Sequence, residues 1–193
     1  MKRTSVATVT FYDLNKPDMA VRSELALRTI EDAIKKNCNV IVVDGGSTDI
    51  FVKKAKGLGA IVLSQEGKNG ISYGQQQAIR VASEMFDPDL YILIEPEKAG
   101  LLSQYFDQIT APVYRGEADM VVVGRTAKSM STAPPMQQLI DTAKNTFWKT
   151  LTGRDEDICF APRVWNSLAN SHFLNYKPTK NWDLFHGPRI DAI

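Results

Sequence analysis

The chain has 193 residues, of which 44% are hydrophobic and 23% charged, and its formal net charge is +1. This length and composition suit one soluble domain with a sizeable core, and the charge gives no reason to expect nucleic acid or an anionic membrane as the main partner. No stretch approaches the roughly 18 apolar residues of a membrane span, and the N-terminus lacks the apolar run of a signal peptide. A cytoplasmic location is therefore the default expectation.

Apolar strand-like runs alternate with amphipathic helical patterns along the chain. Strands are expected at residues 6–11, 40–43, 60–63, 90–94 and 120–123, and helices around 26–34, 51–58, 71–85 and 101–109. This alternation predicts an α/β fold with a mostly parallel, open sheet between helices, in one domain over 1–193. The most loop-like segment is 128–135, a candidate mobile lid. Cys38 and Cys159 show no metal-site spacing, so two reduced, buried thiols are expected.

The stretch CNVIVVDGGSTD at 38–49 carries the strongest local signal. Its apolar run predicts a buried strand that ends at Asp44, and the Ser-Thr-Asp that follows predicts the start of a helix. Ligands bind at the carboxyl ends of strands in open α/β sheets, where Gly45 and Gly46 allow close approach. The alternative interpretation is an ordinary strand-to-helix turn.

The segment EGKNGISYGQQQAI at 66–79 places glycines and a lysine between a strand and a helix. Amides around Gly67 and Gly70, the helix N-terminus and the ammonium of Lys68 predict an anion site suited to a diphosphate. A solvated turn is the alternative. The glutamines at 75–77 are interpreted as a polar helix face rather than a sugar site, although one of them could reach a sugar hydroxyl.

The strand LYILIEPEK ends in two carboxylates, Glu95 and Glu97. Paired hard oxygen ligands suit Mg²⁺ or Mn²⁺ on a diphosphate. Lys98 offers a different interpretation, because its ammonium could replace the cation or pair with Glu95. An exposed acidic turn with a local salt bridge is the third alternative.

Together these strings resemble the motifs of family-2 glycosyltransferases, which have the GT-A fold. The resemblance implies that Asp44 contacts the base of a nucleoside-diphosphate sugar and that Lys68 lies near the diphosphate. It also aligns Glu95 and Glu97 with the family's Asp-x-Asp motif, so that Glu95 would reach toward the ribose and Glu97 would ligate the metal. Two Glu residues around Pro96 depart from the common pattern.

Two further roles follow from the resemblance. Asp157 is the first choice for the carboxylate that receives the acceptor proton, because the apolar run 158–161 after it is expected to be a strand that fixes its direction. Solvated surface is the alternative for this acidic cluster. His186 is a candidate to complete the metal shell, with a packed or surface histidine as the alternative. Family members often continue past this length, so the domain is expected to be short at its C-terminus.

The sequence thus predicts a metal-assisted glycosyltransferase that moves a sugar from a nucleoside-diphosphate sugar to an unknown acceptor. A homo-oligomer is one of the quaternary structures that the sequence allows. A catalytically silent nucleotide-binding relative is the main alternative. A nucleotidyltransferase is less favoured, because the segment after the first strand, YDLNKPD, lacks the glycine-rich loop of that class.

Overall fold

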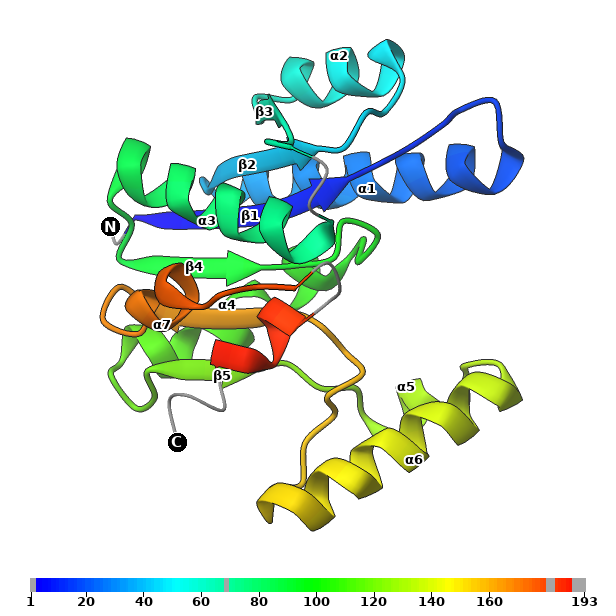
Figure 1. Ribbon diagram of the computed structural model, residues 1–193, viewed down its shortest axis with the longest axis vertical. Coiled ribbons are helices and arrows are strands. Elements are labelled where there is room, and N and C mark those ends of the chain that lie inside the picture. Colours follow the sequence, from blue (N-terminus) through cyan, green and yellow to red (C-terminus); the bar gives the residue numbers. More distant parts are fainter. Residues whose placement is uncertain (1–2, 68–69, 180–182, 189–193) are drawn as a thin grey trace.

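The computed structural model describes residues 3–67, 70–179 and 183–188. Its centre is a six-stranded sheet in the order β3-β2-β1-β4-β6-β5 (Figure 1). Five strands run parallel, and β6 runs antiparallel to its neighbours β4 and β5. This confirms the predicted mostly parallel α/β sheet. The strands are β1 Thr4–Thr10, β2 Asn39–Asp44, β3 Ile61–Ser64, β4 Leu90–Leu93, β5 Met120–Val122 and β6 Arg163–Asn166.

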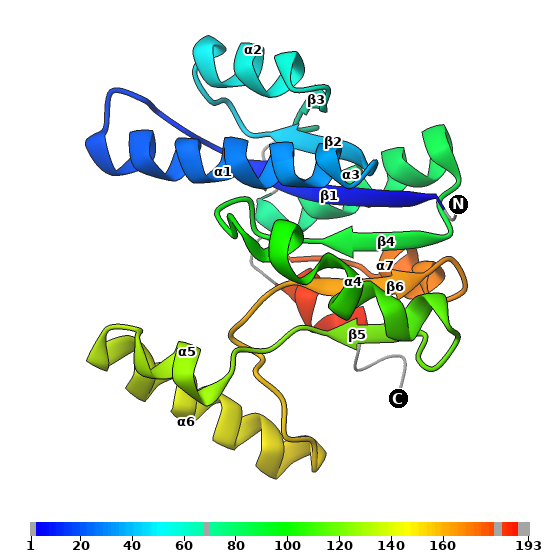
Figure 2. The same ribbon diagram turned by 180° about the vertical axis from the view of Figure 1, so that it is seen from behind.

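Helices cover both faces of the sheet. The face toward the viewer in Figure 1 packs against α3, α7 and the short 3-10 helix η1, and the face seen in Figure 2 packs against α1, α2 and α4. The helices are α1 Pro17–Lys35, α2 Asp49–Gly57, α3 Ile71–Phe86, α4 Leu101–Tyr114, α5 Ala127–Ser131, α6 Pro135–Thr152, α7 Asn170–Asn175 and η1 Asp183–Phe185. No helix in the described part of the chain has the length and apolar character needed to cross a membrane.

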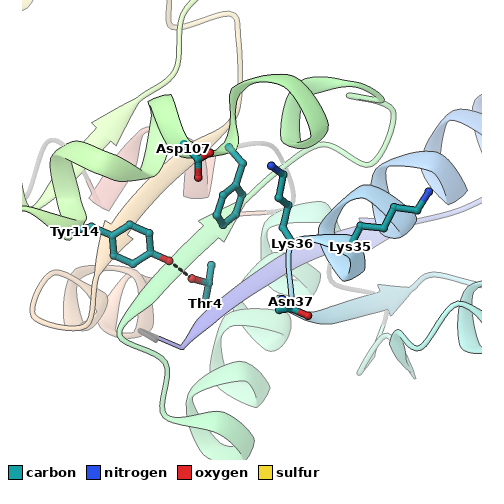
Figure 3. A pocket seen from close by; sticks show the side chains of 7 residues that line it. Thr4, Lys35, Lys36, Asn37, Asp107 and Tyr114 are labelled. Atoms are coloured by element: carbon teal, nitrogen blue, oxygen red, sulfur yellow. Dashed lines mark hydrogen bonds between the residues drawn. The ribbon is translucent and has the colours of Figure 1, made fainter.

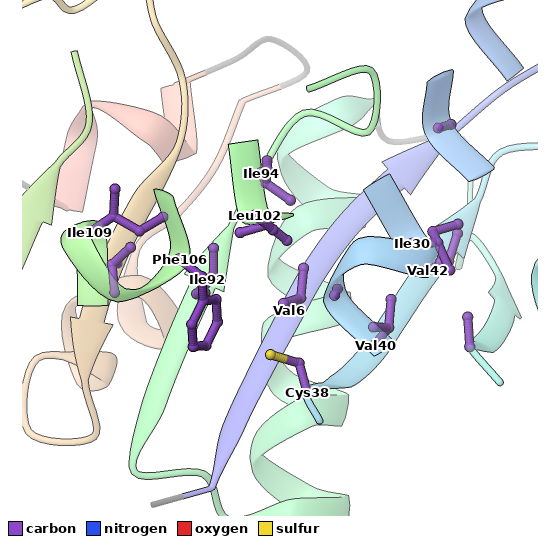
Figure 4. Close-up of a cluster of buried hydrophobic side chains, with 14 of the residues drawn as sticks. Val6, Ile30, Cys38, Val40, Val42, Ile92, Ile94, Leu102, Phe106 and Ile109 are labelled. Carbon is purple, nitrogen blue, oxygen red and sulfur yellow. The ribbon is translucent and has the colours of Figure 1, made fainter. Parts of the chain in front are cut away.

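The two cores explain the continuous apolar strands. In β2, Val40 and Val42 enter the core beneath α1, whereas Ile41 and Val43 enter the core beneath α3. A strand covered on both sides needs apolar residues at every position, which is why these runs do not alternate with polar residues. Figure 4 shows the first core, where side chains from α1, α4 and the central strands meet.

Two predicted segments are different in the structure. The segment 128–135 is not a plain loop, since α5 ends at Ser131 and α6 begins at Pro135. The run 158–161 is not a strand, because it forms turns and β6 begins only at Arg163. The first residue of a helix needs no backbone N–H for hydrogen bonding within the helix, so Pro135 is well suited to that position. The prolines interpreted as loop residues therefore help to begin a helix.

Helices α5 and α6 project from the body of the domain in both views (Figures 1 and 2). Both thiols are free, but only Cys38 is fully buried, while Cys159 is half-buried. Burial raises the pKa of Cys38 to about 12, so this thiol stays protonated. One stripe of α6 leaves large apolar side chains exposed, namely Met136, Leu139, Ile140, Phe147 and Leu151.

Candidate functional site

The sequence motifs meet at the carboxyl edge of the sheet. In the register of the strands, Thr10 lies beside Asp44, and Asp44 lies beside Ser64, so β1, β2 and β3 end together. The strand β4 is parallel to β1, and Glu95 follows its last residues on the same edge. Because β6 runs in the opposite direction, it begins at this edge with Arg163. The topology therefore places four strand ends and one strand start along one crevice.

Two adjoining hollows follow this edge, and we call them together the edge cleft. The first has a volume of about 290 Å³ and the second about 570 Å³. They share Gly45, Gln65 and Gly70, so they form one continuous depression of the size that small ligands occupy. Tyr12, Arg22 and Glu97 are among the residues of the first hollow, and Asp44, Gly46 and Gly67 are among those of the second. Lys68 lies outside the described residues.

The carboxylate of Asp44 is used to shape its own turn. Oδ2 accepts hydrogen bonds from the backbone N–H groups of Gly46 at 3.0 Å and Ser47 at 2.8 Å. Oδ1 accepts from the hydroxyl of Thr10 at 2.7 Å and from the hydroxyl of Ser47. Asp44 is only 8% exposed. Its side chain therefore fixes the glycine turn that lines both hollows.

The glutamine run has a structural role that the sequence interpretation missed. Gln77 donates to the carbonyl of Ser64 and accepts from the N–H of Glu66, so it anchors the segment after β3. Gln75 is buried, and Gln76 donates to three backbone carbonyls at the end of α7. The glutamines interpreted as a polar helix face are thus partly buried, and Gln76 and Gln77 satisfy backbone groups inside the fold. Gln65 similarly donates to the carbonyl of Gly70 and fixes the wall of the edge cleft.

Glu97 is held by two residues of the N-terminal part of the chain. Its Oε1 accepts from the Tyr12 hydroxyl at 2.8 Å and from Arg22 Nε at 3.0 Å, and Arg22 Nη2 lies 2.8 Å from the same oxygen. Burial, and secondly the negative charge of Glu97, raises the pKa of Tyr12. The phenol therefore stays protonated and donates a hydrogen bond to Glu97. One carboxylate oxygen thus receives three donors.

Arg22 is a site residue that the sequence analysis missed. It lies on α1 at the spacing that continues the buried stripe of Ala26, Ile30 and Ala33 toward the helix start. Its partner Glu97 lies 75 positions later in the chain, so no local pattern identifies Arg22 as a site residue.

Glu95 also has its own cation. Its Oε2 lies 2.7 Å from Lys98 Nζ, and the same ammonium lies 4.7 Å from the centre of the Phe160 ring. The side chains of Glu95 and Lys98 are only 25% and 28% exposed. This is the local pair that the sequence offered as an alternative to a metal site.

Asp157 is the centre of a separate charged cluster. Its Oδ2 lies 2.7 Å from Arg125 Nε, its Oδ1 accepts from Arg125 Nη2 at 2.9 Å, and Asn145 donates to it at 3.1 Å. Arg125 also pairs with Asp141 of α6 at 2.9 Å. Burial alone would raise the pKa of Asp157, but the hydrogen bonds from Arg125 and Asn145 outweigh it and lower the pKa to about 2. The side chain is oriented by this cluster, and not by the strand start that was expected.

A further hollow of about 560 Å³ lies at the opposite edge of the sheet, and Figure 3 shows it. It is formed near the start of β1 by Thr4, Lys36, Asn37, Phe106 and Tyr114, among others. None of the sequence motifs contributes to it. Its residues are therefore useful as controls for binding at the edge cleft.

Comparison with known proteins agrees with the resemblance. Residues 21–94 match the model of the family described as Glycosyl transferase family 2. A crystal structure of glucosyl-3-phosphoglycerate synthase from Mycobacterium tuberculosis, in complex with Mn²⁺, UDP-glucose and phosphoglyceric acid, superposes with a TM-score of 0.68 at 15% identity. The fold is GT-A. The match covers 99% of this chain and 65% of that chain, so the present chain spans about two thirds of its GT-A relative.

Two more solved structures have the same arrangement. The synthase from Mycobacterium tuberculosis in complex with phosphoglyceric acid gives a TM-score of 0.65 at 16% identity, with 99% of this chain and 65% of that chain covered. A structure described as a mycobacterial protein gives 0.68 at 14% identity and covers 99% of this chain and 61% of the other. No curated protein matches the sequence. The predicted GT-A fold and the family-2 resemblance are thereby confirmed.

The described residues of this GT-A chain hold no ready cluster of metal ligands. Within residues 3–67, 70–179 and 183–188, no three His, Cys, Asp or Glu side chains lie together in a way that could hold an ion. His186 packs with its ring 6.5 Å from that of Trp148, and burial, together with the charge of Arg163, lowers its pKa to about 4. Glu97 is instead engaged by Arg22. The carboxylates of Glu97 and Glu95 are each paired with a side-chain cation, and the assignment of Glu97 and His186 as metal ligands stays a prediction.

Proposed function

We propose that the chain is a glycosyltransferase that binds a nucleoside-diphosphate sugar in the edge cleft and transfers its sugar to an acceptor. The observation that carries this proposal is the convergence of Asp44, Gly67 and Glu97 on one continuous depression at the carboxyl edge of a GT-A sheet. The family-2 match over residues 21–94 supports it, since that segment contains the first two of these residues. The solved GT-A structure that contains UDP-glucose supports a nucleoside-diphosphate sugar as the donor.

The proposed donor lies with its base toward Asp44 and its diphosphate toward Arg22. The turn held by Asp44 presents Gly45 and Gly46 without side chains, which lets a flat base approach the backbone. Gly67 and Gly70, which line the same hollow as Asp44, have φ angles of 68° and 95°, and Gly70 also lines the hollow that contains Arg22. The N-terminus of α3 favours an anion. Lys68 belongs to the same segment and is proposed to lie near the diphosphate.

The reaction that this arrangement supports is displacement at the anomeric carbon with departure of the nucleoside diphosphate. Negative charge grows on the leaving diphosphate, and a fixed guanidinium and helix amides stabilise it without reorganisation. Glu95, which follows β4 at the same edge, is proposed to face the sugar-nucleotide. The protein's main contribution is thus electrostatic.

Asp157 remains the proposed recipient of the acceptor proton. Its ion pair with Arg125 and its pKa of about 2 make it a weak base as it stands. The role requires Arg125 to turn away when the acceptor binds. Asp157→Asn should then lower kcat for transfer and leave the Kd for UDP unchanged, whereas equal losses for transfer and binding would assign Asp157 to the fold alone.

A catalytically silent nucleotide-binding relative is the second candidate. The observation in its favour is that both acids of the EPEK string are occupied by internal ion pairs. Hydrolysis of UDP-glucose and GDP-linked sugars by the purified chain separates the two, because a silent relative binds the nucleotide without turnover. Gly45→Val should weaken binding and turnover, since a Cβ added at Gly45 would lie 3.3 Å from Gln65 Oε1 and 3.4 Å from the carbonyl oxygen of Thr10. Lys36→Ala, in the opposite hollow, is the control.

Three further parts of the proposal have narrower support. Free thiols at Cys38 and Cys159 support a reducing compartment such as the cytoplasm. The exposed apolar stripe of α6 supports a homo-oligomer. The phosphoglyceric acid in the relatives is a candidate class of acceptor, a small organic anion.

A further inference from the structure

We propose that Arg22 supplies the positive charge that faces the diphosphate, so that this chain binds its nucleotide without a divalent metal. The inference rests on the proposed function and concerns the same cleft. The solved GT-A structure with UDP-glucose contains Mn²⁺. In this chain, Glu95 and Glu97 are instead paired with the side-chain cations Lys98 and Arg22.

The position of Arg22 suits this role. Pro17 starts α1, and Arg22 lies in the second helical turn, beside the first hollow of the edge cleft. Its side chain is 53% exposed, whereas that of Glu97 is 21% exposed. The carboxylate thus lies beneath the guanidinium, and the positive group is the one that an entering ligand meets.

The guanidinium is held in place from below. Glu97 Oε1 binds Arg22 and the Tyr12 hydroxyl, and Tyr12 is 1% exposed. The Tyr12 ring packs edge-on against Phe51, with ring centres 4.8 Å apart. Because these contacts fix Glu97, they also fix Arg22, and a preorganised cation loses little entropy when it binds a phosphate.

A divalent ion at Glu97 would meet two obstacles. Three donors already approach Oε1, and the fixed charge of Arg22 lies within 3.0 Å of that oxygen. A hard cation would share one carboxylate with a guanidinium of the same sign. Lys98 presents the same obstacle at Glu95, where it is fixed between the carboxylate and the Phe160 ring.

The ligand chemistry follows from the shape of the guanidinium. Arg22 uses Nε and Nη2 toward Glu97, and the N–H groups on its other side are suited to the paired oxygens of a phosphate. A diphosphate between Arg22 and Gly70, which line the same hollow, would have a cation on one side and the amides at the start of α3 on the other. This arrangement replaces the charge that a metal would provide.

The test is calorimetric titration of UDP and GDP into the full chain, once with Mn²⁺ and once with excess EDTA. We expect Kd values within about threefold of each other under the two conditions. Arg22→Met should weaken binding in EDTA at least tenfold, whereas Arg28→Met, an exposed arginine of the same helix, should leave it unchanged. Thermal unfolding monitored by circular dichroism establishes that each variant is folded.

Each outcome decides a different question. Binding in Mn²⁺ that disappears in EDTA would refute the inference and leave the proposed function intact. Absence of binding under both conditions would refute the proposed function itself. Normal binding by Arg22→Met in EDTA would refute the role of Arg22. If Arg22→Met fails to fold, Glu97→Gln is the deciding variant. Binding that persists in EDTA would support the inference, because Glu97 then only positions Arg22. Loss of a Mn²⁺-dependent binding would refute it, because Glu97 then acts as a metal ligand.

Discussion

Replacement of Asp44 measures how much of the edge cleft depends on one carboxylate. Asp44→Ala removes the acceptor of four hydrogen bonds, two of them from backbone N–H groups. Each such bond contributes about 1 kcal/mol, and donors left without a partner add to this cost. Water can reach part of the turn, so we expect Asp44→Ala to lower the free energy of unfolding by about 3 kcal/mol.

Asp44→Asn is the matched variant. Its carbonyl oxygen can accept from the N–H groups of Gly46 and Ser47, and its NH₂ group can donate to the hydroxyls of Thr10 and Ser47, which also accept. Only the contribution of the charge is lost, so the expected cost is about 1 kcal/mol. Urea denaturation of both variants gives the comparison. Equal costs for Ala and Asn, or an Ala variant as stable as wild type, would refute the turn-building role of Asp44.

Three other predictions concern His186, Asp157 and Gln77. His186 stays neutral in the folded chain down to a pKa of about 4, whereas the unfolded chain binds a proton below about 6.5, so stability should fall as the pH drops from 6.5 to 4. His186→Asn should flatten this dependence in urea denaturation across that range, and His172→Asn, which changes an exposed histidine, should not. Asp157→Asn should lower the free energy of unfolding by about 3 kcal/mol at pH 7, because it leaves Arg125 without its closest carboxylate. The stabilisation by Asp157 is fully present above its unfolded pKa near 3.8 and is lost as the pH falls through its folded pKa of about 2. A cost unchanged between pH 7 and pH 2 would contradict the ion pair. Gln77→Ala should speed hydrogen exchange of the Glu66 amide at least tenfold, and unaltered exchange there would mean that Gln77 does not anchor the segment.

The sequence predicted those parts of the fold that depend on short-range patterns. The apolar run before Asp44 and the Ser-Thr-Asp after it identified β2 and α2, because burial on both faces requires a continuous apolar run and these polar residues are typical of helix starts. The alternation of strands and helices then fixed which ends of the strands share an edge. Asp44, Gly67 and Glu97 could be assigned to the same edge for this reason alone.

The sequence failed where partners are distant in the chain. Glu97 meets Arg22 across 75 positions, and no spacing rule connects a helix residue with a strand end so far away. The structural role of Gln76 could not be predicted for the same reason, since the carbonyls that it meets lie nearly 100 positions later. The antiparallel strand β6 was misplaced because the apolar run at 158–161 precedes it, and the sheet register, rather than hydrophobicity, selects Arg163–Asn166.

Binding of a nucleoside diphosphate at the edge cleft is tested most directly by NMR of the chain labelled with ¹⁵N-glycine. The sequence contains 12 glycines, so each amide gives a resolvable signal. On titration with UDP or GDP, the signals of Gly45, Gly46 and Gly70, which line the cleft, should shift together and saturate, while those of Gly116 and Gly153, which end α4 and α6, stay in place. Saturating nucleotide that leaves the cleft signals unchanged, or that moves only the distant glycines, would contradict the account.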